Sequence, residues 1–125
     1  MDAANLNWVA VIVGTIAAFG LGMLWFSPRM FGKGWSEGSH NLTPPDSPPM
    51  LAMVLTFVAL FLLAFVVGMT ETNQAIGTAI AAIFSAALIV GGMDLFSQKS
   101  GKATLIDSGY IVACGVLMVL AQAVF

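Results

Sequence analysis

Four long hydrophobic runs, separated by short polar segments, account for most of the chain. They cover approximately residues 7–26, 50–69, 75–96 and 105–125. Each is close to the roughly 20 residues that an α-helix needs to cross a hydrocarbon core about 30 Å thick. In hydrocarbon the backbone N–H and C=O groups must be paired internally, so the runs must be helical. The pattern predicts an all-α membrane protein with four transmembrane helices in one domain, residues 1–125.

The polar segments predict how these helices are connected. Residues 70–74 and 97–102 are short, so each joins two antiparallel neighbours, which gives an up-down bundle with short loops. The first loop, residues 27–49, is longer. Its second half, residues 43–49, is too rich in proline for a helix and should be stiff and extended. We expect a short interfacial helix in its first half, within residues 28–35.

Composition supports a membrane rather than an aqueous environment. The chain is 59% hydrophobic and 8% charged, whereas soluble domains carry roughly 25% charged residues. Four basic residues are too few to follow a phosphate backbone, so no nucleic-acid partner is expected. The first run follows Asp2 rather than a basic segment and has no clear cleavage site, so we expect it to be retained as a span.

Charge is distributed unevenly between the loops, and this predicts orientation. All the basic residues fall in the first and third loops: Arg29, Lys33, Lys99 and Lys102. The opposite side carries Asp2 and Glu71 but no Lys or Arg. The positive-inside rule then places both basic loops in the cytoplasm and both termini outside, in a bacterial inner membrane. This one-sidedness, and a first helix without a carboxylate, argue against a small four-helix multidrug exporter.

Small residues recur at every fourth position on two of the predicted helices. The first carries Ala10, Gly14, Ala18 and Gly22, and the third carries Gly77, Ala81 and Ser85. Such stripes allow close helix packing in membranes. They predict either a docking face for a homo-oligomer or larger complex, or contacts within the four-helix bundle itself.

Asp94 and Asp107 are the acidic residues in or beside the apolar runs. A charge within the membrane is costly, so each requires an explanation. One hypothesis is a proton- or ion-binding site at the inner mouth of the bundle. The other is interfacial pairing with the nearby basic residues, with Asp107 also capping the last helix in a box with Thr104.

No arrangement of residues indicates catalysis or metal binding. His40 stands alone, Cys114 is a single cysteine, and no hydrolase, zincin or P-loop motif is present. We therefore expect no enzyme activity, no cofactor and no metal. Aromatic residues near the ends of the runs are most simply an interfacial belt: Trp8, Trp25, Phe26, Phe31, Trp35 and Tyr110.

Several stretches carry a family resemblance. They are Asn7-Trp8, LGMLWFSP at 21–28, FGKGW at 31–35 and LIDSGY at 105–110. Together they resemble a bacterial membrane family known as domain of unknown function 1761. The resemblance implies a small four-helix membrane protein and a shared role for Trp25, Pro28, Gly32, Lys33, Asp107 and Tyr110. Asp94 departs from the family, whose members tend to carry a neutral residue there, which argues against a two-carboxylate mechanism common to the family.

Three functional hypotheses follow. The leading one is a non-enzymatic protein of the lipid bilayer, a homo-oligomer or accessory subunit that acts by helix packing in a larger complex. The alternative is a small oligomeric transporter or channel for protons, ions or small solutes. A membrane enzyme acting on lipid or quinone ranks last, because no catalytic group supports it.

Overall fold

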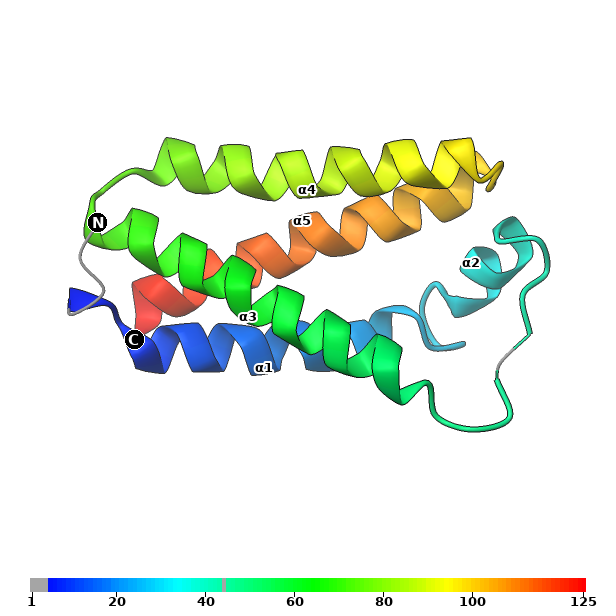
Figure 1. Ribbon diagram of the computed structural model, residues 1–125, viewed down its shortest axis with the longest axis horizontal. Helices are drawn as coiled ribbons and strands as arrows, with labels where there is room; N and C mark the ends of the chain where they lie inside the picture. Colours follow the sequence, from blue (N-terminus) through cyan, green and yellow to red (C-terminus); the bar gives the residue numbers. More distant parts are fainter. Residues whose placement is uncertain (1–4, 44) are drawn as a thin grey trace.

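The computed structural model describes residues 5–43 and 45–125, and its secondary structure there is entirely helical. Four long helices form a bundle in which each runs antiparallel to the long helix before it (Figure 1). They are α1 (Trp8–Trp25), α3 (Met50–Thr72), α4 (Ile76–Phe96) and α5 (Gly101–Val124). Each is long and apolar enough to cross a membrane. The prediction of an all-α bundle with four spans is confirmed. Asp2, used above to predict orientation, and Pro44, in the proline-rich stretch, lie outside the described residues.

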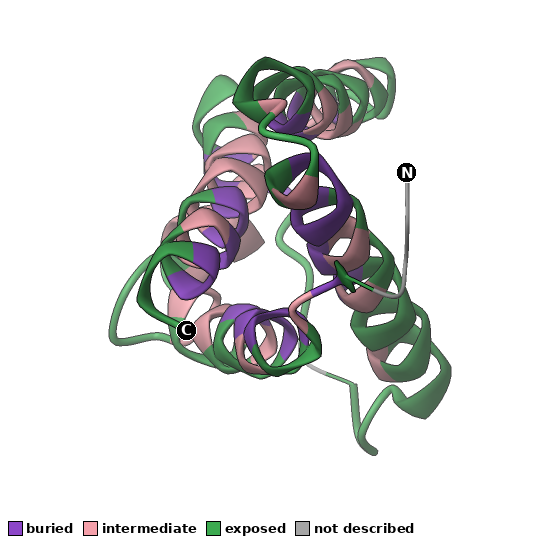
Figure 2. Ribbon diagram, turned by 90° about the vertical axis from the view of Figure 1, so that its left-hand side faces the viewer, coloured by how far each residue is buried: buried purple, intermediate pink, exposed green. Residues whose placement is uncertain are grey.

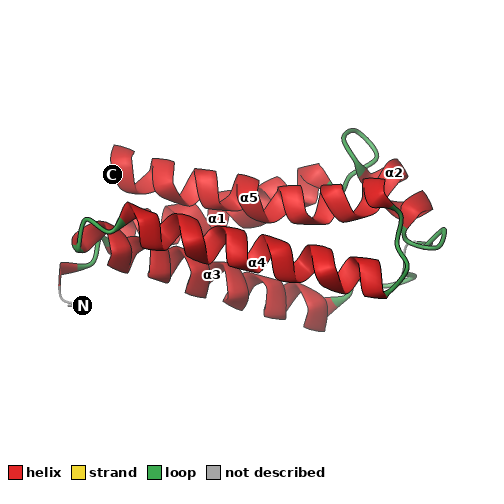
Figure 3. Ribbon diagram, turned by 90° about the horizontal axis from the view of Figure 1, so that it is seen from above, coloured by secondary structure: helices red, strands yellow, loops and turns green. Residues whose placement is uncertain are grey.

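Helix α5 packs along both α1 and α4. Helix α3 contacts α1 and crosses in front of it in the view of Figure 1. Seen from one end, the buried residues turn toward the middle of the bundle and the outer faces are exposed (Figure 2). Seen from above, α2 (Gly32–Gly38) lies at the end of the bundle where α4 passes into α5 (Figure 3). The exposed outer faces are apolar, as a hydrocarbon solvent requires.

Helix α2 begins later than expected, at Gly32 rather than near Pro28. The residues between α1 and α2 form a tight turn, in which Phe31 N–H donates to the Trp25 carbonyl and Gly32 N–H to that of Ser27. A Cβ at position 32 would overlap the Phe26 carbonyl oxygen. The turn therefore requires glycine at this position because of close backbone approach.

Helix α5 begins at Gly101, four residues before the predicted start near Leu105. The Ser100 side chain accepts the Ala103 N–H at 3.0 Å and caps the helix. The capping box expected from Thr104 and Asp107 is therefore wrong. Ser100 is the better cap because serine directly before the first helical turn can accept an N–H that has no partner within the helix.

The small-residue stripe of α1 packs inside the bundle. Ala10, Gly14 and Ala18 are buried and Gly22 is half-buried. A Cβ at Gly14 would lie 3.4 Å from Met118 Cα on α5, so the two backbones approach closely. At the other end of the stripe, Gly22 makes room for Tyr110. This stripe serves contacts within the chain, which was one of the two alternatives left open above.

The second stripe is placed differently, because Gly77, Ala81 and Ser85 are all exposed. Helix α4 buries another edge, formed by Ala79, Ile83, Ala87 and Asp94. That edge is offset by two residues, or about 200° around a helix of 3.6 residues per turn. Packing of the second stripe within the bundle is therefore not found, and its use as an external docking face stays a prediction.

Substitution at Gly22 tests the internal α1–α5 contact. A Cβ there would lie 2.6 Å from Tyr110 Oη, whose hydroxyl donates to the Ala18 carbonyl at 2.7 Å. Gly22→Ala should lower the free energy of unfolding by roughly 1–3 kcal/mol through overpacking. Gly20→Ala is the matched control, because a Cβ there meets nothing within 4 Å. Equal stability of the two variants in a denaturing-detergent titration followed by circular dichroism would contradict this contact.

Candidate functional site

Helix α2 is docked against the turn between α4 and α5. Ser100 N–H donates to the Gly38 carbonyl at 2.9 Å, and His40 Nε2 lies 2.7 Å from the Ser97 carbonyl oxygen. A Cβ at position 38 would overlap the Ser100 side chain. Glycine at 38 is therefore needed for α2 to approach this turn. The result is a cover over one end of the bundle (Figure 3).

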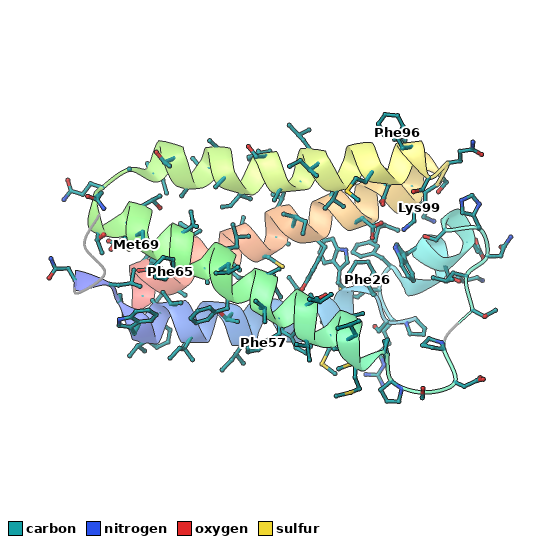
Figure 4. The ribbon with its side chains drawn as sticks, in the orientation of Figure 1. Phe26, Phe57, Phe65, Met69, Phe96 and Lys99 are labelled. Atoms are coloured by element: carbon teal, nitrogen blue, oxygen red, sulfur yellow. The ribbon has the colours of Figure 1, made fainter. Side chains whose placement is uncertain are left out.

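Beneath this cover lies a cluster of three charged side chains, Asp94, Lys99 and Asp107. Lys99 Nζ is 3.6 Å from Asp94 Oδ1 and 3.4 Å from Asp107 Oδ2. Asp94 comes from the last turns of α4, Asp107 from the second turn of α5, and Lys99 from the turn between them. Figure 4 shows Lys99 between the end of α4 and α2. The short loop thus supplies the cation for carboxylates on both helices that it joins.

The side chains of this cluster are largely removed from solvent, with exposed fractions of 11% for Asp94, 13% for Asp107 and 23% for Lys99. Desolvation opposes the burial of such charges, and mutual attraction offsets that cost. Removing one partner of such a buried arrangement leaves an uncompensated charge, which costs more than the pair contributes. The three side chains are therefore interdependent.

Aromatic side chains surround the cluster and connect it to the core. The Lys99 ammonium lies 5.4 Å from the centre of a Trp35 ring, a cation–π contact. Phe26 packs edge-on against both Trp35 and Tyr110, with ring centres 5.4 and 5.3 Å apart. Trp25 donates its indole N–H to the Ile106 carbonyl at 3.0 Å. The aromatic residues at this end thus hold α1, α2 and α5 together in addition to marking the end of the bundle.

Two polar atoms near the cluster lack a hydrogen-bond partner among the described residues. They are the buried Asp94 Oδ2 and the buried Trp35 Nε1. With both carboxylates ionised, the cluster holds two negative charges and one positive charge. It can therefore accept a proton or a small cation. The described residues nowhere bring three His, Cys, Asp or Glu side chains together as a metal-ligand set.

Of the candidate functional residues that the sequence predicts, some lie in or beside the charge cluster and others are exposed away from it. Trp25, Asp94, Asp107 and Tyr110 lie at this end, in or beside the cluster and its aromatic surroundings. Pro28 is exposed in the turn before α2, and Lys33 is exposed on α2. The ion pairs of the described part of the chain involve Lys99 rather than Lys33.

The sequence alone does not predict that Lys99 and Trp35 belong to this site. Lys99 was one of four basic residues within reach of the carboxylates, and Trp35 was assigned to an interfacial belt. The available signal was the position of Lys99 in the short loop that joins the two acidic helices. The contact of Trp35 depends on how α2 folds back, which spacing along the chain does not reveal.

The opposite end carries a second group of polar residues. Gln122 is buried, and its Oε1 has no hydrogen-bond partner within the described residues. It lines a cavity of about 300 Å³ together with Thr70, Glu71 and Gln74. Between the two ends the core is mostly apolar and includes Ile83, Cys114 and Met118, while the buried Thr15 hydroxyl donates to the Val11 carbonyl of its own helix. One copy of the chain thus has polar groups at both ends with a hydrophobic middle.

Comparison with known proteins identifies the family. Residues 9–122 match the family model described as Protein of unknown function (DUF1761). Neither the comparison with curated proteins nor that with solved structures gives a match. The match includes all four long helices, the turn before α2 and the charge cluster. It confirms the resemblance noted in the sequence, and the chain, with its four helices apolar enough to span a membrane, belongs to the family of proteins of unknown function DUF1761.

Proposed function

We propose that this protein is a non-enzymatic subunit of a membrane assembly, either with copies of itself or with a larger complex, and that the outer face of α4 makes the contact. The observation that supports it is the position of the second small-residue stripe. Gly77, Ala81 and Ser85 lie on the exposed side of α4, and a Cβ at Gly77 would meet nothing within 4 Å. Small residues at such a face let another helix approach closely.

The fold leaves the outer face of α4 available for contact with another helix. The α1 stripe is already used inside the chain by Met118 and Tyr110. Helix α4 buries one edge against α5, and most of its remaining large side chains are exposed, including Phe84, Leu88 and Ile89. In a bilayer, association depends on van der Waals fit rather than on removal of apolar surface from water. A surface with small residues flanked by large ones suits that fit.

A bulky residue in the α4 stripe tests this assignment. Ala81→Phe should weaken association by about tenfold, equal to about 1.4 kcal/mol, because the ring keeps the partner helix away. Ala17→Phe is the matched control, since Ala17 is also an exposed alanine within a span, on α1. Mass measurement in mild detergent and in nanodiscs reads the assembly state. A strictly monomeric wild-type protein without a co-purifying partner, or equal losses in both variants, would refute the proposal.

We further propose that the protein lies in the inner membrane of a bacterium, with α2 and the α4–α5 turn in the cytoplasm and the α3–α4 turn outside. The support is the placement of all four basic residues at one end of the bundle, in or next to the α1–α3 connection and the α4–α5 turn.

Cysteine labelling tests this orientation in intact cells. With Cys114 replaced by serine, a membrane-impermeant maleimide should label Asn73→Cys directly, and Gln98→Cys after the membrane is made permeable. Both positions are exposed in turns at opposite ends of the bundle. The reverse pattern would invert the assignment.

The alternative function, a small oligomeric transporter or channel for protons, ions or small solutes, is favoured by one specific observation. Asp94 and Asp107 share the ammonium of Lys99, and the buried Asp94 Oδ2 has no hydrogen-bond partner among the described residues. The cluster therefore has capacity for an incoming cation or proton. Because the middle of one bundle is apolar, a path through the membrane would have to form between subunits.

Flux measurements test this alternative. Vesicles loaded with a pH-sensitive dye should equilibrate a proton gradient faster with the wild-type protein than without it. Asp107→Asn should return the rate to that of protein-free vesicles, because it removes one of the two carboxylates of the cluster. Glu71→Gln should keep the wild-type rate, since Glu71 is exposed at the other end. No acceleration by the wild-type protein would eliminate transport of protons.

A further inference from the structure

The end of the bundle that carries the charge cluster also has an apolar groove on its outer surface. It has a volume of about 460 Å³ and is lined by Trp25, Phe31, Lys102, Leu105 and Ile106. Trp25 ends α1, Phe31 belongs to the turn before α2, and the other three residues form the start of α5. Leu105 is 74% exposed, so this groove opens to the surroundings of the bundle rather than to its core.

The walls of the groove are fixed by contacts already present in the chain. The Trp25 indole N–H donates to the Ile106 carbonyl at 3.0 Å, and the Trp25 and Phe31 rings lie 4.7 Å apart. These contacts hold the large aromatic surfaces in place without any ligand. A groove with preformed walls binds a flexible chain at a lower entropic cost than one that must be assembled.

Lys102 supplies the one charged group among the lining residues. It is exposed on the first turn of α5. Its Cε lies beside Gly34, where a Cβ would approach it to 2.6 Å. The absence of a side chain at position 34 thus allows the lysine to lie across α2. The ion pairs of the described residues involve Lys99, and Lys102 takes no part in them.

These features favour an anionic ligand with a long apolar part. Lys102 lies in the first turn of a helix that is long and apolar enough to span a membrane, and headgroups are expected at the ends of such a helix. The first turn of α5 adds the positive end of a helix dipole at the same place. Below it, Trp25 and the exposed Leu105 present an apolar surface to the hydrocarbon. A basic residue above an apolar groove between membrane helices matches a phosphate headgroup with its acyl chain.

We propose that this groove binds an anionic phospholipid, with its phosphate on Lys102 and an acyl chain along Trp25, Phe31 and Leu105. An anionic headgroup is preferred over a zwitterionic one because it leaves a net negative charge to pair with the lysine. This site is separate from the outer face of α4, so it stands or falls independently of the proposed assembly.

The test compares two spin-labelled lipids, phosphatidylglycerol and phosphatidylcholine, in phosphatidylcholine vesicles that contain the full-length protein. Electron spin resonance measures the fraction of each lipid that the protein immobilises. The wild-type protein should bind phosphatidylglycerol about fivefold more strongly, as expected for one lysine near the headgroups. Lys102→Gln should reduce this preference to near one, and Lys102→Arg should retain it.

Lys33→Gln is the matched control, since Lys33 is an exposed lysine at the same end but does not line the groove. It should retain the wild-type preference. Equal binding of both lipids to the wild-type protein would overturn the proposal. So would an unchanged preference in Lys102→Gln, or equal losses in the Lys102 and Lys33 variants, which would indicate general charge attraction. Displacement of the labelled lipid by inorganic phosphate would reassign the site to a soluble anion.

Discussion

A backbone immersed in hydrocarbon has no water with which to form hydrogen bonds, and the architecture follows from this constraint. It makes each long apolar run a helix and leaves side-chain fit as the means by which these helices recognise one another. Helix α5 has the central place, because it packs against α1, α2, α3 and α4. Its contacts with α1 depend on small residues: Gly14 receives Met118, and Gly22 receives Tyr110.

The charged side chains of the described residues lie at the ends of the bundle, where their cost is lowest. At one end, Asp94, Asp107 and Lys99 form a shared ion cluster, and Trp35 of α2 covers its ammonium. The connection between α1 and α2 makes this cover possible, since Gly32 permits the tight turn that leads into α2 at the end of the bundle (Figure 1). The charge cluster, the aromatic contacts and the short helix are therefore parts of one arrangement.

The same end carries two sites of different character. The ion cluster is enclosed, and its two carboxylates share the ammonium of Lys99. The groove beside Lys102 faces outward and pairs a basic group with apolar walls. The outer face of α4 differs from both, because its exposed residues Gly77, Ala81 and Ser85 are small and uncharged. These two surfaces, one basic and apolar and the other lined by small side chains, are the ones proposed above for a lipid and for another helix.

The sequence by itself determined the four spans and the antiparallel order of the helices, since these depend on the length and composition of continuous segments. It also located Asp94 and Asp107 near one end of the bundle. Only the tertiary structure decided which small-residue stripe faces inward. Both stripes have small residues at every fourth position, and they differ in which helix packs against them. It likewise selected Lys99 among four basic residues, and placed Trp35 over it, because both contacts depend on the fold of a turn and a short helix. Periodicity records which residues share a face of one helix, whereas the partner of that face is set by the packing of the whole bundle.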